Sequence, residues 1–270
     1  MSLFHYTNIE AIQSILTNKK IWLTDIRFLN DSAELHNGLN IFLHELKNLQ
    51  NISSLDKKNI KDAIEYIDHT LSDPINLGIE EDPFYIFSFG TAKDRLSQWR
   101  IYGNYAIEFD EANLKEFIPI LHPCNYDDAS KHEIAKNTLL QSLEKMCLDI
   151  NADHGCFGIS GLDAIEDIVE KAATFKHKGF FEEEEVRTIS QLGQNTIQYR
   201  TKNNMLIPYL ELPISLDCIK CIHIGPSKEQ ELAYQSMVSF VQHIEREWRI
   251  ESGNIEYRLQ VETSEIPYRG

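Results

Sequence analysis

The stretch 84–110, FYIFSFGTAKDRLSQWRIYGNYAIEFD, decides the fold class of this chain. Its first six residues, Phe84 to Phe89, are dense in aromatic side chains and predict a buried strand. A short helix is predicted after Asp94, and it ends at a Gly-Asn turn. The last six residues, Tyr105 to Asp110, alternate apolar and polar side chains, which predicts a second strand. This block is therefore the expected β-rich centre of the fold.

The segments on either side predict further strands and helices. Leu3 to Tyr6 is a short strand pattern, and Thr7 or Asn8 can cap the helix that follows. Strands are also predicted at 21–24, 183–192, 197–202, 205–212, 219–224 and 256–263, with a helix from 227 to about 242. Because no repeat or flexible linker is present, residues 1–270 predict a single α+β domain with a mixed or antiparallel β core and helical insertions at about 31–75 and 128–175.

Composition and charge narrow the classes of function. The chain carries 26 Lys and Arg against 42 Asp and Glu, which gives a net charge of −16. A surface this acidic does not attract polyanions, so we expect neither extended coating of nucleic acid nor a membrane partner. The N-terminal residues do not resemble a signal peptide, and no run reaches the roughly 20 apolar residues of a membrane helix. A cytoplasmic location is therefore expected.

The five cysteines, Cys124, Cys147, Cys156, Cys218 and Cys221, are odd in number and scattered. This pattern favours reduced thiols over a disulfide framework. Cys218 and Cys221 form a CxxC, but a zinc site usually needs a second such pair. Structural thiols are therefore expected, and no metal is predicted.

Three separated clusters contain side chains of the types that catalysis or ligand binding requires. In the first, His5 and Thr7 share one face of an extended strand while Tyr6 takes the other, with Asn30, Asp31 and Glu34 downstream. The polar pair can meet a ligand, or His5 can be a surface histidine beside a helix cap.

The second cluster surrounds the short helix of the central block. It contains Ser88, Asp94, Arg95, Ser97, Gln98, Trp99, Arg100 and Tyr102. On a helix, Arg95, Trp99 and Tyr102 lie at positions i, i+4 and i+7, on one stripe. Such a stripe can stack a flat ring and hold a phosphate, or it can pack into the core.

The third cluster is the acidic run Glu182 to Glu185, which predicts either a solvated loop or the start of a strand. In a strand, Glu183, Glu185 and Arg187 would share one face, with the two carboxylates about 7 Å apart. Two carboxylates so close are costly unless they bind sugar hydroxyls or a developing cation. The strand interpretation therefore indicates a functional site.

Together these segments resemble a bacterial family known as domain of unknown function 2971. The resemblance is carried by HYTN…AIQSIL…IWLTD…FLND..E (5–34), FSF…D.LSQWR.YG (87–103), AIEFD (106–110), KHKGFFEEEEVR (176–187), IHIGP (222–226) and S..PYR (264–269). The His-Tyr-Thr opening and the late Glu-x-Glu strand are in turn similar to the ADP-ribosyltransferase group. The resemblance therefore implies an ADP-ribosyltransferase-like α+β core.

ADP-ribosyl transfer breaks the bond between nicotinamide and ribose through an oxocarbenium-like transition state. The resemblance implies that His5, supported by Thr7, holds the adenosine-side ribose, and that Glu185 stabilises the cation at the nicotinamide ribose. Glu183 would orient the acceptor. The expected catalytic residues are thus Glu185, Glu183 and His5, and the expected NAD-binding residues are His5, Tyr6, Thr7, Ser88, Arg95, Gln98, Trp99, Arg100 and Tyr102. In this set Trp99 or Tyr102 would stack on nicotinamide, Arg95 or Arg100 would meet the pyrophosphate, and Tyr6 would point away.

Three hypotheses follow. The first is an ADP-ribosyltransferase-like protein that takes NAD as its substrate and transfers or hydrolyses ADP-ribose, as a toxin or phage-defence effector with an unknown macromolecular acceptor. The second is a non-catalytic module that binds a small anionic nucleotide or a nucleic-acid end. The third is a metal-dependent nuclease that uses Glu183 and Glu185.

Overall fold

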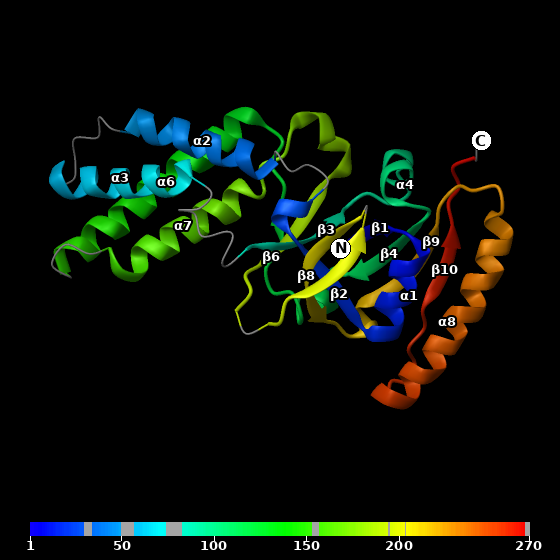
Figure 1. Cartoon of the computed structure of the whole chain (residues 1–270). Coiled ribbons are helices and arrows are strands. Elements are labelled where there is room, and N and C mark those ends of the chain that lie inside the picture. Colours follow the sequence, from blue (N-terminus) through cyan, green and yellow to red (C-terminus); the bar gives the residue numbers. More distant parts are fainter. Residues whose placement is uncertain are drawn as a thin grey trace.

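The computed structural model describes residues 1–29, 34–49, 57–73, 83–152, 157–193, 195–202 and 204–267. Ten described strands form one mixed sheet in the order β10-β9-β4-β1-β3-β2-β8-β7, with β6 pairing β3 and β5 (Figure 1). The strands are β1 Ser2–Thr7, β2 Lys20–Asp25, β3 Tyr85–Gly90, β4 Tyr105–Asp110, β5 His122–Pro123, β6 Glu185–Ser190, β7 Gln198–Lys202, β8 Met205–Pro213, β9 Ile219–Ile224 and β10 Gln260–Thr263. The α+β class expected from the sequence is confirmed.

The helices are α1 Ile9–Asn18, α2 Glu34–Leu49, α3 Lys57–Ser72, α4 Leu96–Tyr102, α5 Glu111–Leu114, α6 Asp128–Ala152, α7 Gly158–Ala172 and α8 Gln230–Ser252, with 3-10 turns η1 Ile26–Phe28, η2 Lys178–Glu183 and η3 Leu216–Cys218. Figure 1 shows α2, α3, α6 and α7 gathered at one end of the molecule, and α8 beside β10 at the other. Among the described helices, none combines the length and the apolar character needed to cross a membrane.

The alternation of β3 explains how the sheet separates two cores. Tyr85, Phe87 and Phe89 face a core that α1 and α8 cover, whereas Ile86 faces the core built by α2, α3, α6 and α7. Successive side chains of a strand point to opposite faces. Ser88 therefore shares the face of Ile86 and lies near the polar residues described below.

Strand β1 pairs with β4 from Ser2 to Thr7 but meets β3 only where Phe4 lies opposite Gly90. On the same edge, β2 pairs with β3 only at Tyr85 and Ile86. Among the described residues, the middle of β3 thus has a partner strand on one side only, which is β6. This separation of β1 from β3 positions the candidate site.

Several elements differ from the sequence-based expectation. Strand β6 begins at Glu185, not at 183, because Glu184 adopts a left-handed conformation with φ of 44°. Helix α8 continues to Ser252, beyond the expected end near 242, and β10 begins at Gln260, not at 256. The short elements α5 and β5 were not expected. The proposed cap at 30–32, Cys156 and the last residues of the 264–269 motif lie outside the described residues.

Candidate functional site

One small pocket draws residues from all three clusters that the sequence singled out. It is lined by Phe4, His5, Tyr6, Ser88, Phe89, Gly90, Gln98, Tyr102, Glu183 and Glu185, and its volume is about 50 Å³. Seven of these ten residues belong to the expected site: His5, Tyr6, Ser88, Gln98, Tyr102, Glu183 and Glu185. The elements that meet here are β1, β3, α4, η2 and β6.

His5 fills the gap where β1 separates from β3. Its Nδ1 lies 2.8 Å from the carbonyl oxygen of Ser88, and its ring stacks on Phe87 with the ring centres 4.1 Å apart. Burial lowers the pKa of His5 to about 4, against the opposing effect of the Ser88 hydrogen bond. The ring is therefore neutral at pH 7. Because a carbonyl only accepts, Nδ1 carries the proton and Nε2 is left as an acceptor for a hydroxyl group.

Tyr6 and Trp99 form a small core on the other face of β1. Trp99 is 4% exposed, and its Nε1 donates to Asp94 Oδ1 at 2.8 Å. The Tyr6 ring meets the indole edge-on at 4.6 Å, and the Tyr6 hydroxyl donates to the carbonyl of Ala92. The indole therefore anchors α4 against the sheet and does not line the pocket, so the core interpretation of the stripe holds for Trp99 and not for Arg95 or Tyr102.

Helix α4 instead presents Gln98 and Tyr102, one turn apart, to the pocket. The Tyr102 hydroxyl donates to Glu183 Oε1 at 3.2 Å. Burial and the neighbouring Glu183 carboxylate raise the pKa of Tyr102 well above its usual range, so the phenol keeps its proton and remains a donor.

The acidic run does not form a continuous strand face, and that expectation was wrong. Glu183 ends the 3-10 turn η2, and the left-handed Glu184 reverses the chain before β6 starts at Glu185. As a result Glu184 points outward and pairs with Arg95, whose Nη2 lies 2.8 Å from Glu184 Oε1. Glu183 and Glu185 are both buried at the pocket.

A buried ion network surrounds these two carboxylates. Lys176 Nζ pairs with both Glu183 and Glu185. On the other side, Arg187 Nε lies 2.7 Å from Glu185 Oε1, and Arg187 Nη2 lies 2.7 Å from Glu34 Oε2. The network therefore contains two cations and three carboxylates.

The network sets the charge of its acidic members. Burial disfavours the ionised form of Glu185, but Arg187 and Lys176 outweigh it and lower the pKa of Glu185 to about 2. Burial raises the pKa of Glu34 despite the opposing effect of Arg187. Of these two carboxyl groups, Glu34 therefore takes up a proton more readily, and Glu185 stays ionised.

Sequence reasoning missed the parts of the site that support Glu185. Lys176 occurs in the KHKGFF motif, but nothing in that motif indicates a pairing with the acids that follow. The Tyr126 hydroxyl accepts from the backbone N–H of Glu185 at 2.9 Å, and the backbone N–H of Cys124 donates to the Glu185 carbonyl at 2.9 Å. These contacts come from a segment that carried no recognisable motif.

The remaining expected residues lie outside the pocket lining. Thr7 is the last residue of β1. Arg95 directly precedes α4 and is partly exposed, and Arg100 lies on the exposed side of α4. Cys218 packs in the core shared with α8 and donates to the Ser215 carbonyl at 2.8 Å, whereas Cys221 lies on β9 outside that core. The CxxC residues therefore do not act as a pair.

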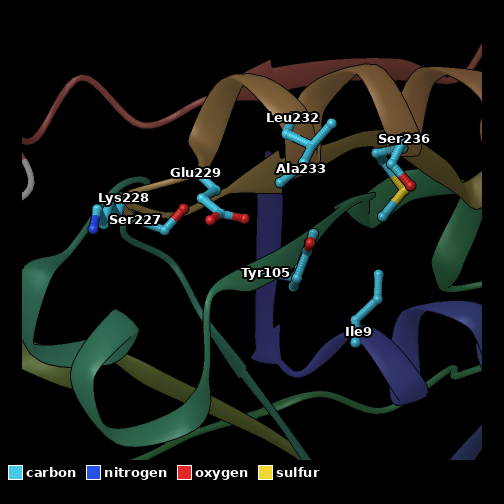
Figure 2. Close-up of a pocket in the computed structure, with 9 residues that line it drawn as sticks. Ile9, Tyr105, Ser227, Lys228, Glu229, Leu232, Ala233 and Ser236 are labelled. Carbon is cyan, nitrogen blue, oxygen red and sulfur yellow. The ribbon is translucent and has the colours of Figure 1, made fainter.

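A second, larger cavity of about 460 Å³ shares no lining residue with the first. Figure 2 shows Tyr105 and Ile9 on one side of it and Leu232, Ala233 and Ser236 of α8 on the other, with 227–229 at one end. Its lining is mostly apolar and has only Lys228 and Glu229 as charged residues. The smaller pocket, where the charged side chains Glu183 and Glu185 are buried, is therefore the candidate functional site.

Comparisons of the chain with protein-family models, with curated proteins and with solved structures found no match. The family resemblance seen in the motifs therefore stays a prediction.

Proposed function

We propose that this chain binds NAD at the pocket between β1, β3, α4 and β6 and transfers or hydrolyses its ADP-ribose unit. One observation carries the proposal: His5, Tyr102 and Glu185 come from three distant segments of the sequence and line the same pocket. The resemblance of the motifs to the ADP-ribosyltransferase group predicts a role at NAD for the same three residues.

Each side chain has surroundings that suit its proposed role. The Nε2 acceptor of His5 would receive a hydrogen bond from a ribose hydroxyl. Glu185, ionised at neutral pH, would stabilise positive charge on the ribose as the bond to nicotinamide breaks and its electron pair leaves with neutral nicotinamide. Water or a nucleophile of the acceptor would then bond to the ribose carbon and release its proton to Glu183.

Binding requires the pocket to widen. Pockets for ligands of drug size measure about 300 to 1,000 Å³, and a cavity of about 50 Å³ holds only water. The place to widen is the gap between β1 and β3, which His5 bridges by its bond to Ser88. Glu185 would at the same time exchange its contact with Lys176 for the ribose hydroxyl.

The second candidate is a non-catalytic nucleotide-binding module, and the ion network is the observation that favours it. Lys176 and Arg187 neutralise Glu185, and Lys176 also neutralises Glu183, as in a site built for stability. The metal-dependent nuclease has no comparable support, because within the described residues the side chains that pair with the carboxylates of Glu183 and Glu185 are Lys176, Arg187 and Tyr102, and none is a usual metal ligand beside them.

The test is to incubate the full chain with labelled NAD, alone and with candidate acceptors of protein and nucleic acid, and to measure nicotinamide release. We expect Glu185→Gln to lower the rate by about 10²- to 10³-fold, since it removes the group that stabilises the transition state. Glu184→Gln is the matched control, because Glu184 is the exposed neighbour that pairs with Arg95, and its rate should stay within about twofold of the wild type.

The outcomes separate the two candidates. Saturable binding of NAD with intact NAD recovered afterwards, and the same in Glu185→Gln, assigns the pocket to the binding module. A wild-type protein that neither binds NAD nor releases nicotinamide overturns the proposal.

A further inference from the structure

We propose that Glu108, Cys221 and His223 form a zinc-binding site on the face of β4 and β9, with Glu262 orienting the imidazole and water in the fourth coordination position. This inference is independent of the NAD proposal. Within the described residues, one ligand atom from each of Glu108, Cys221 and His223 lies within 4.8 Å of the others.

The register of the sheet places these side chains on one face. Glu108 of β4 lies directly opposite Cys221 of β9. His223 follows Cys221 by two residues on the same strand, and Glu262 of β10 lies beside His223 in the parallel pair. Residues that lie opposite each other, and residues two apart on a strand, point to the same side of a sheet. Strands β4, β9 and β10 thus bring all four groups to one face, with a register shift of β4 directly after Glu108.

Two of the candidate ligand atoms, Glu108 Oε2 and His223 Nε2, are hydrogen-bonded to each other, and the third, Cys221 Sγ, lies 3.6 Å from the carbonyl oxygen of Ile222. Ser2 Oγ donates to Glu108 Oε1 at 2.6 Å, and Lys220 Nζ lies 3.6 Å from the same oxygen. The other oxygen, Oε2, faces His223 Nε2 at 2.9 Å. Tetrahedral zinc with bonds of about 2.0 to 2.3 Å keeps its ligand atoms about 3.3 to 3.8 Å apart, so Oε2 and Nε2 would separate slightly as the ion replaces the proton between them.

The opposite ring nitrogen of His223 completes the arrangement. Nδ1 lies 3.7 Å from Glu262 Oε2. With zinc on Nε2, the imidazole proton would lie on Nδ1, and Glu262 would accept it once the two atoms approach to hydrogen-bond distance, as carboxylates do beside histidine ligands of zinc. Lys93 Nζ lies 2.7 Å from the same Glu262 oxygen.

Burial distinguishes this cluster from an ordinary surface ion pair. Cys221 is 2% exposed and His223 is 4% exposed, and the ring of Phe4 packs against the imidazole. The nearby cations are mobile by comparison, because the side chains of Lys220 and Lys93 are 46% and 51% exposed. Both ammonium groups can turn toward solvent when the ion enters. Zinc binding would release the thiol proton of Cys221, since thiolate is the ligand.

Another group of metal-ligand type, His44, Glu45 and His132, joins α2 to α6. It lacks a thiol, and the side chain of His44 is 63% exposed. Thiolate, imidazole and carboxylate together favour zinc, and burial on strands favours a fixed geometry. The helical group therefore serves as the internal control.

The test is to strip the full chain of metal and titrate it with Co²⁺ and then with Zn²⁺. We expect one equivalent of Co²⁺ to give visible bands of tetrahedral intensity and a near-ultraviolet thiolate charge-transfer band, and Zn²⁺ to abolish both. Cys221→Ser should remove the charge-transfer band, whereas Cys218→Ser, the matched control in the core, should keep it. Glu262→Gln should weaken Co²⁺ binding about 10- to 100-fold.

Circular dichroism of each variant shows whether it folds, and the wild-type spectrum reports thiolate ligation even where Cys221→Ser does not fold. The proposal is overturned if the wild type binds no stoichiometric Co²⁺ or gives no thiolate band. It is also overturned if Cys218→Ser alone removes the band, or if His132→Ala, and not His223→Gln, removes stoichiometric binding.

Discussion

The ammonium group of Lys176 forms an ion pair with the carboxylate of Glu185 inside the protein, and it pairs with Glu183 as well. The relationship matters because Glu185 is the residue on which the proposed chemistry depends. A ligand that uses this carboxylate must offer it contacts that replace Lys176. The ion pair therefore affects both the stability of the folded protein and the proposed binding of NAD at the pocket.

Replacing Lys176 with Met should destabilise the protein. The substitution leaves two buried carboxylates next to each other with one counter-ion fewer, and breaking a buried pair costs about 3 to 5 kcal/mol. Urea denaturation measures the free energy of unfolding, with Lys178→Met, an exposed lysine of η2, as the control. Adding Glu183→Gln to Lys176→Met should restore part of the loss. An unchanged midpoint in Lys176→Met would show that the pair does not stabilise the fold.

The stability of the protein should fall as the pH decreases from about 4.5 toward 2. The pKa of Glu185 is lowered from 4.5 to about 2 in the folded chain, because Arg187 and Lys176 overcome the effect of burial. A lowered carboxyl pKa stabilises the folded state above the unfolded pKa, and this contribution of about 3 kcal/mol is lost as pH falls through the folded pKa. Denaturation at several pH values should show a flatter profile for Glu185→Gln in this window. Equal slopes in the two proteins would contradict the assignment.

His5 should produce a separate loss of stability at higher pH. Burial lowers its pKa from 6.5 to about 4, so below pH 6.5 the unfolded chain takes up a proton that the folded chain does not. Stability attributable to neutral His5 is thus present above 6.5 and declines as the pH falls from 6.5 to 4. In His5→Gln the profile should be flatter than in the wild type across that interval, with the lowered pKa of His122 still contributing. NMR titration of His5 should give a pKa below 5, and a value near 6.5 would refute this prediction.

Gly225 and Trp99 should be coupled energetically. A Cβ placed on Gly225 would lie 2.8 Å from the indole Cε3 of Trp99, which is too close for atoms of a packed core. Gly225→Ala should therefore cost about 1 to 3 kcal/mol in the wild type. In a Trp99→Leu background the same change should cost much less, since the smaller side chain leaves room. If Gly225→Ala costs the same free energy of unfolding in both backgrounds, the strain does not arise from contact with Trp99.

Most of the regular structure could be predicted from the sequence, because local spacing determines it. Aromatic and alternating patterns predicted β3 and β4, and Asn8 caps α1 by accepting from the backbone N–H of Ala11. The choice of His5, Tyr102 and Glu185 as site residues also came from local motifs. Their placement in one pocket was not predictable from spacing, because it depends on the separation of β1 from β3.

The tertiary structure alone decided which residues of the acidic run 182–185 face the pocket and which point outward. Glu184 takes a left-handed conformation, which a non-glycine residue adopts only where surrounding contacts hold it, so the start of β6 could not be predicted from propensity. The partners of these acids come from elsewhere, and Arg187 reaches Glu34 across 153 residues. Local pattern reports which face of an element is apolar. Which charges become neighbours depends on packing between distant elements, and here that packing determined the site.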